Sequence, residues 1–209
     1  MKFNTNDTAI VLTDPQNEFL SKNGAGYNLV KDVLEKNNTI ENLVKLLKTA
    51  KEKDYKIFIS PHYYYPHDHQ WAFEAKGEKM MHDMNMFERK GPSEAVDKNS
   101  GADILEVLKP YIEDGRTIIS SPHKIFGPQT NDLVLQLRKQ KIDKIILGGM
   151  NANLCVESHL RDLVEQGFEV YIANDATGAP GFDSFNAALI NFEMISSGSY
   201  STEEIIKNL

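Results

Sequence analysis

The stretch LGGMNANLCVESHLRDLVEQGFEVYIANDATGAP, residues 147–180, decides the fold that we predict for this chain of 209 residues. It continues an apolar run, Lys144–Leu147, which predicts a buried strand that ends at a pair of glycines. A helical pattern begins at Cys155 or just before it, and Phe168–Ala173 then predicts another strand. A strand, a helix and a second strand in this order indicate a parallel sheet, because parallel neighbours need a crossover connection.

The same alternation of strands and helices extends along the rest of the chain. Three more clear strands are predicted at Thr8–Thr13, Tyr55–Ser60 and Thr117–Ser120. A sixth strand is expected near Met84–Phe87. Further helices are expected over residues 28–53, 102–108, 131–140 and 182–195, and a capping box at Ser201–Glu204 opens a short last helix.

This order predicts an α/β fold with a doubly wound, mostly parallel sheet and helices on both faces, in three Rossmann-like layers. The length predicts a single domain over residues 1–209.

The connection over residues 61–100 is irregular and contains many aromatic, histidine and methionine residues. It contains YYYPHDHQW, which is dense in aromatic residues and histidine, and GEKMMHDMNMFERKG, which is dense in methionine. A connection of this length is unusual unless it is functional or has structure of its own. We expect a lid or pocket wall with one short helix near Glu78–Met84. The candidate substrate-binding residues are Phe19, His62, Tyr65 and Trp71.

Composition excludes several classes of partner. The formal net charge is −7 and no basic stripe is visible, so nucleic acid is not an expected partner. No apolar run approaches the roughly 20 residues that a membrane helix needs, so no membrane partner is expected. The first residues, MKFNTNDT, lack the apolar region of a signal peptide. The chain has one cysteine, which excludes an internal disulfide and fits a reducing cytoplasm, where we expect this protein.

Three side chains with complementary chemistry follow three different predicted strands. Asp14 ends the first strand, Lys124 follows the strand at Thr117–Ser120, and Cys155 follows the strand at Lys144–Leu147. The carboxyl ends of parallel strands meet at one edge of the sheet, where function gathers. The sequence therefore predicts that an acid, a cation and a thiol converge there.

A thiol at the start of a helix is a candidate nucleophile. A free cysteine titrates near pKa ~8.5, and a helix N-terminus and a neighbouring cation both favour the thiolate. We therefore expect Lys124 and the helix to lower the pKa of Cys155. The Asp14 carboxylate can take the thiol proton and return it to a leaving amine. The alternative for Cys155 is an inert buried thiol.

The chain resembles the isochorismatase-like cysteine hydrolases, a family with nicotinamidases and carbamoyl amidohydrolases among its members. The resemblance is carried by AIVLTDPQNEFL, SSPHKIFGPQTNDLVLQLR and GGMNANLCVESHLRDLVEQGFEVYIANDATGAP. It implies a six-stranded parallel sheet and a catalytic triad of Asp14, Lys124 and Cys155. It also implies a cis peptide bond between Met150 and Asn151, which would aim the N–H groups of Asn151 and Cys155 at the oxyanion.

The sequence departs from the metal-binding pattern of the nicotinamidases. The resemblance aligns Tyr63 and Tyr65 with an aspartate and a histidine of that pattern, and only His69 matches. Two tyrosines and one histidine are a poor divalent site, so no metal and no other cofactor is expected. A site improvised from His62, His67 and His69 remains an alternative.

We therefore predict a metal-independent cysteine hydrolase that cleaves an amide, ureido or carbamoyl C–N bond of a small molecule through a thioester. The resemblance suggests a homo-oligomer. The alternatives are a binding protein on the same scaffold, with an exposed redox-responsive thiol, and a metal-dependent nicotinamidase. His159, four residues after Cys155, is expected to have a packing or subunit-contact role. His123, beside Lys124, is expected to be structural or to line the rim of the site.

Overall fold

The computed structural model describes residues 2–209 and contains a six-stranded sheet in the order β3-β2-β1-β4-β5-β6. Every neighbouring pair of strands in it is parallel. The strands are β1 (Thr8–Thr13), β2 (Lys56–Ser60), β3 (Ile118–Ile119), β4 (Lys144–Met150), β5 (Glu169–Gly178) and β6 (Gly198–Tyr200). The predicted parallel α/β sheet is thus confirmed, and β1 and β4 lie at its centre.

Helices connect these strands. The α-helices are α1 (Asn17–Leu20), α2 (Tyr27–Asn37), α3 (Thr39–Glu52), α4 (Lys76–Asp83), α5 (Lys109–Ile112), α6 (Leu133–Lys139), α7 (Glu157–Glu165), α8 (Gly181–Ile195) and α9 (Thr202–Ile206). A π-helical turn, η4 (Ala152–Val156), precedes α7, and short 3₁₀ turns lie at Asp68–Gln70, Glu106–Leu108 and Pro128–Thr130. Within residues 2–209, no helix combines the length and apolar character that crossing a membrane requires.

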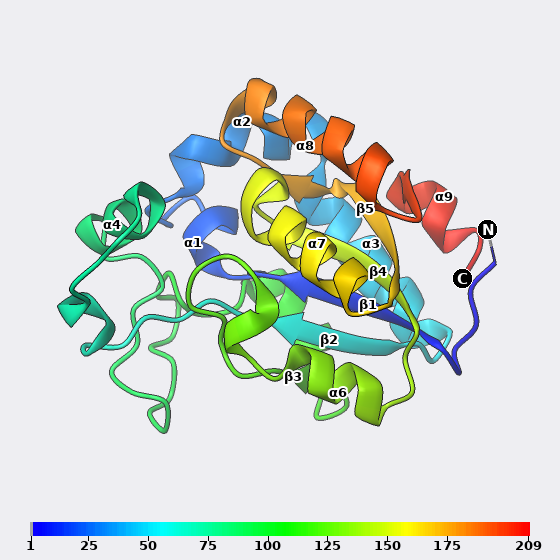
Figure 1. Ribbon diagram of the computed structural model, residues 1–209, viewed down its shortest axis with the longest axis horizontal. Helices are drawn as coiled ribbons and strands as arrows, with labels where there is room; N and C mark the ends of the chain where they lie inside the picture. The colour runs from blue at the N-terminus through cyan, green and yellow to red at the C-terminus, as the bar shows by residue number, and fades with distance from the viewer. Residues whose placement is uncertain (1) are drawn as a thin grey trace.

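The alternation of side chains along each strand divides the core into two layers. In β1, Ile10 and Leu12 face a cluster with α3, whereas Ala9 and Val11 face a cluster with α6, α7 and α8. In Figure 1, α6 and α7 lie in front of the sheet and α3 lies behind it. A strand buried on both faces reads as a continuous apolar run, which is the pattern of a covered parallel sheet.

Three predicted elements differ from the structure. The helix expected over 28–53 is two helices, because Asn38 adopts a left-handed conformation with φ 50° and ends α2. The helix expected over 102–108 is wrong, since only Glu106–Leu108 forms a 3₁₀ turn there. The strand expected near Met84–Phe87 is also wrong, and the sixth strand is the edge strand β6.

Residues 61–100 lie with α4 beyond the end of the sheet toward which β1 runs (Figure 1). Backbone hydrogen bonds of Tyr64 join the beginning of this connection to its later part. The Tyr64 N–H donates to the Phe87 carbonyl at 3.0 Å, and the Tyr64 carbonyl accepts from Arg89 N–H at 2.9 Å. The Phe87 N–H in turn donates to the buried Glu18 carboxylate at 2.8 Å. The connection is therefore anchored to α1, the short helix that follows Asp14.

Candidate active site

Asp14 directly follows β1 and is held at the carboxyl edge of the sheet. Its backbone is left-handed, with φ 47°, a conformation that aspartate tolerates better than most residues. The Asp14 N–H donates to the Ser60 carbonyl at 3.1 Å, and the Thr13 hydroxyl donates to the Met150 carbonyl at 3.0 Å. These bonds connect the ends of β1, β2 and β4, so the position of Asp14 is set by three strands.

The end of β4 passes unusually close to β1. Gly149 has φ 109°, and a Cβ at this position would lie 2.0 Å from the Thr13 carbonyl oxygen. Only glycine fits such an approach. The next peptide bond, Met150–Asn151, is cis, as the resemblance implied. The chain then enters η4, which carries Cys155 back to the edge where Asp14 lies.

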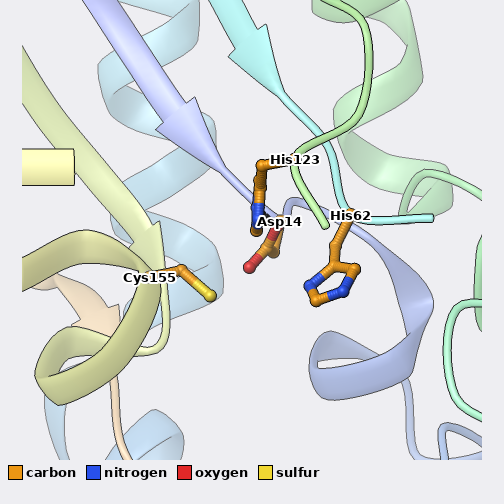
Figure 2. Close-up of side chains that lie close together, drawn as sticks. All are labelled: Asp14, His62, His123 and Cys155. Carbon is orange, nitrogen blue, oxygen red and sulfur yellow. Dashed lines mark hydrogen bonds and ion pairs between the residues drawn. The ribbon is translucent and has the colours of Figure 1, made fainter. Parts of the chain in front are cut away.

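Asp14 and Cys155 meet in a buried cluster with two histidines, His62 and His123. One ligand-type atom from each of the four side chains lies within 4.8 Å of the others. Figure 2 shows the Asp14 carboxylate between the Cys155 sulfur and the two rings. His123 Nε2 lies 2.7 Å from Asp14 Oδ1, and both side chains are fully buried. Four separate segments of the chain therefore supply one compact site.

The structure places Lys124 elsewhere. Its ammonium donates to the Tyr63 carbonyl at 3.0 Å and pairs with the Asp68 carboxylate, and it lies 3.9 Å from the centre of the Tyr65 ring. Among the described residues it forms no ion pair with Asp14. His123 reaches Asp14 instead, because neighbouring residues of an extended segment point to opposite sides.

A repeated tripeptide was the sequence signal for the histidines. Ser-Pro-His occurs at residues 60–62, where β2 ends, and again at residues 121–123, shortly after β3. The two copies lie in register, since His62 and His123 form a parallel bridge in which His123 N–H donates to the Pro61 carbonyl at 3.0 Å. Identical turns after neighbouring parallel strands bring both rings to one place. His123 therefore lies inside the buried cluster, whereas we expected a structural or rim-lining role.

The pKa of the Cys155 thiol is shifted in the direction opposite to the one we expected. Burial raises its pKa well above the ordinary value, and the Asp14 carboxylate beside it raises the pKa further. The backbone N–H groups of Asn151 and Cys155 lower the pKa, but by less. The resting thiol is therefore protonated. The expected lowering of the Cys155 pKa by Lys124 is therefore wrong. The thiol is also buried, which differs from the exposed thiol of the redox-responsive alternative.

His159 is a structural support for this site. Its Nδ1 lies 2.7 Å from the Cys155 carbonyl and its Nε2 lies 2.8 Å from the Ser60 hydroxyl. Burial, and then the nearby His123 ring, lower the pKa of His159 to about 3. The neutral ring thus bonds the nucleophile helix to the end of β2, as its expected packing role implied.

Of the four predicted substrate-binding residues, three pack against other side chains and one lines a cavity. Phe19 is buried against Phe87, with ring centres 5.5 Å apart, and His62 is fully buried in the cluster. Trp71 is partly buried and packs near Tyr64. Of the four, Tyr65 lines a cavity of about 690 Å³, together with Tyr63, Arg89, Lys109 and Pro122 among others. Tyr63 and Pro122, which line the cavity, are sequence neighbours of His62 and His123. None of the four clustered side chains lines the cavity itself.

The residues aligned with the nicotinamidase metal pattern do not form a metal site. Burial raises the pKa of the Tyr63 phenol to about 12, which disfavours the phenolate that a metal would need. His69 lies 3.2 Å from the Glu88 carboxylate. The improvised site is not formed either, because His62 lies in the buried cluster while His67, with a side chain that is 70% exposed, pairs with Asp68. These residues do not fit a divalent cation.

Two solved structures of hydrolases share this fold. A cysteine hydrolase from Pseudomonas syringae pv. phaseolicola 1448A matches with a TM-score of 0.80 and 20% identity, over 100% of this chain and 94% of its own. The YcaC gene product of Escherichia coli, described as an octameric hydrolase of unknown specificity, matches with a TM-score of 0.67 and 19% identity, over 100% and 82%. At these identities the likeness is one of fold.

Sequence comparison identifies the family. The uncharacterized isochorismatase family protein YecD of Escherichia coli O157:H7 is 38% identical over 78 residues, which are 37% of this chain. That match spans 42% of the length of the relative. The family model of the isochorismatase domain matches residues 8–202, nearly the whole chain. This chain belongs to the isochorismatase family.

Proposed function

We propose that this protein is a cysteine hydrolase that cleaves the C–N bond of a small amide, ureido or carbamoyl compound. Cys155 is the nucleophile, Asp14 is the general base and acid, and His123 positions Asp14. The observation that carries the proposal is the buried Asp14 carboxylate, which lies between the Cys155 thiol and the His123 ring. Lys124, which we expected in the triad, is replaced in this role by His123.

The protonated resting thiol suits this chemistry. Asp14 Oδ2 has no hydrogen-bond partner in the described structure, so it is available to accept the thiol proton as the sulfur attacks the substrate carbonyl. The backbone N–H groups of Asn151 and Cys155, which already face the sulfur, donate to the resulting oxyanion. Asp14 then protonates the leaving amine, and a thioester remains on Cys155. Water, deprotonated by Asp14, releases the acid and the free thiol.

Access to this site requires the 61–100 connection to act as a lid. His62 stacks on Phe87 with ring centres 4.7 Å apart and planes 5° apart, and both residues are fully buried. This stack closes the cluster on the side of the connection. We infer that the substrate enters from the Tyr65 cavity when the stack opens.

A homo-oligomer is supported by the surface of α8. Ile190 and Met194, four residues apart on this helix, are 67% and 82% exposed, and Phe182 near its start is 45% exposed. The octameric state given for the Escherichia coli hydrolase of similar fold agrees with this reading. We place the protein in the cytoplasm, where a cysteine nucleophile stays reduced.

The test is a screen of small amides, ureido acids and carbamoyl compounds, scored by ammonia release. The native protein is expected to release ammonia from at least one class and to form a transient thioester that mass spectrometry locates on Cys155. The variant Cys155→Ala is expected to fold and to release none. Turnover by Cys155→Ala equal to the native rate would refute the proposal.

A further inference from the structure

The buried cluster has more unpaired polar atoms than the hydrolase needs. His62 is fully buried, yet neither of its ring nitrogens has a hydrogen-bond partner in the described structure. His123 Nδ1 and Asp14 Oδ2 are also without partners. A buried polar atom without a partner destabilises a protein. The unpaired ring nitrogens of His62 face a carboxylate, a thiol and a second imidazole, so their lone pairs are available to coordinate a cation.

The four side chains form a ligand set that divalent zinc prefers. Two imidazoles, a thiolate and a carboxylate supply two nitrogens, one sulfur and one oxygen, and each type occurs in tetrahedral zinc sites. A tetrahedral site with bonds of about 2.0–2.3 Å has its ligand atoms about 3.5 Å apart. The atoms here lie within 4.8 Å of one another, so shifts of about 1 Å along side-chain torsions close the site.

The charges of this set also fit a divalent cation. Binding removes one proton, from the Cys155 thiol, which leaves one thiolate, one carboxylate and two neutral imidazoles. Their total charge of −2 cancels that of Zn²⁺, so the completed centre is neutral. A neutral centre suits a site whose Asp14, His62 and His123 side chains are fully buried.

We propose that Asp14, His62, His123 and Cys155 form a Zn²⁺ site, and that bound zinc holds the hydrolase in an inactive state. The inhibitory part rests on the proposed function, because zinc takes the sulfur nucleophile and the carboxylate base out of use. The site differs from the residues aligned with the nicotinamidase pattern, Tyr63, Tyr65 and His69, none of which belongs to it. His62, which hydrolysis leaves without a partner, gains one in the zinc-bound state.

The first experiment measures binding without turnover. Reduced, chelator-treated protein is titrated with Zn²⁺ against a chromophoric chelator, and with Co²⁺ while the absorption spectrum is recorded. One equivalent of each metal is expected to bind, and Co²⁺ is expected to give tetrahedral d–d bands and a thiolate charge-transfer band. Cys155→Ser is expected to lose the charge-transfer band. A protein that binds neither Zn²⁺ nor Co²⁺ would overturn the proposal.

A matched pair of variants tests the ligand set. His62→Phe keeps a ring against Phe87 but removes both nitrogens, and it is expected to weaken zinc binding more than about 100-fold, since even outer-shell partners of a metal are worth 10–100-fold. His67→Phe, on the exposed part of the same loop, is expected to bind zinc as the native protein does. Equal affinity in His62→Phe and the native protein, with both melting cooperatively, would overturn the proposal.

The two proposals fail in different ways. If the native protein hydrolyses a substrate, one equivalent of Zn²⁺ is expected to abolish turnover and a chelator to restore it. Turnover that persists with the site saturated refutes the inhibitory role and leaves the hydrolase intact. Binding of zinc by a protein that hydrolyses none of the panel leaves the metal site intact and refutes the hydrolase.

Discussion

His123→Phe tests the arrangement that most separates this site from the expected triad. The native ring is fully buried, and its Nε2 donates to Asp14 Oδ1 at 2.7 Å. Phenylalanine keeps a ring of similar size but has no donor. Hydrogen bonds to charged groups contribute about 1.5–3 kcal/mol, so the free energy of unfolding is expected to fall by that amount. At this chain length, about 2–4 °C per kcal/mol predicts a melting temperature lower by about 3–12 °C.

The same variant is expected to lose turnover. Without the donor, Asp14 Oδ1 loses the hydrogen bond that holds the carboxylate beside the Cys155 sulfur. A carboxylate that is no longer held in place is expected to accept the thiol proton less efficiently. General-base catalysis contributes about 10²–10⁴-fold, so a loss of at least about 100-fold in ammonia release is expected.

Lys124→Met is the matched control, since it removes the adjacent cation. It breaks the bonds to Asp68 and the Tyr63 carbonyl but touches none of the four clustered side chains. Thermal melts and ammonia release on the best substrate of the panel compare the two variants. Turnover of His123→Phe within fivefold of native, together with a larger loss in Lys124→Met, would refute our reading and return the lysine to the triad.

Three further predictions concern the Cys155 thiol, Gly149 and the Asp114 carboxyl. Because burial and a neighbouring carboxylate raise the pKa of the Cys155 thiol, its alkylation by iodoacetamide is expected to be slower than that of a free thiol at pH 7 and to rise through alkaline pH. Gly149→Ala is expected to lose about 2–5 kcal/mol of stability in urea unfolding, because its Cβ would overlap the Thr13 carbonyl at a positive φ. Burial raises the pKa of the Asp114 carboxyl, but bonds from Lys51 and two backbone N–H groups outweigh it and hold the pKa below its ordinary value. This stabilisation is present above the unfolded pKa near ~3.9 and is lost as pH falls below it, so Lys51→Met is expected to reduce the stability difference between pH 7 and pH 3.

Each of these predictions has a control and a contradicting outcome. For alkylation, unfolded protein in urea gives the reference rate, and a plateau reached below pH 8 would contradict the raised pKa. For Gly149→Ala, the exposed Gly115→Ala tests the effect of positive φ alone, since no atom lies within 4 Å of a Cβ there; equal losses in the two variants would contradict the close approach. For Lys51→Met, the exposed Lys48→Met is the control, and an unchanged pH dependence of Lys51→Met would contradict the role of the ion pair.

Local sequence patterns predicted most of the strands and helices, and they also predicted the edge of the sheet where the site lies. The apolar run at Thr8–Thr13, the strand that begins at Lys144 and the capping box at Ser201 are confirmed because each depends on a local pattern. Placing Asp14 and Cys155 at one edge needed only the rule that parallel strands end together.

The packing of distant segments sets which neighbouring side chain completes the site and whether the Cys155 thiol is protonated. His123 and Lys124 are adjacent, and their directions depend on the register of the segment after β3 against the segment after β2, since a shift of one residue exchanges them. The same register brings in His62, and the burial that results reverses the expected pKa shift of Cys155. Register and burial depend on how distant segments pack together, so the repeated Ser-Pro-His could suggest that the two histidines meet but could not give their burial or the resulting pKa shift.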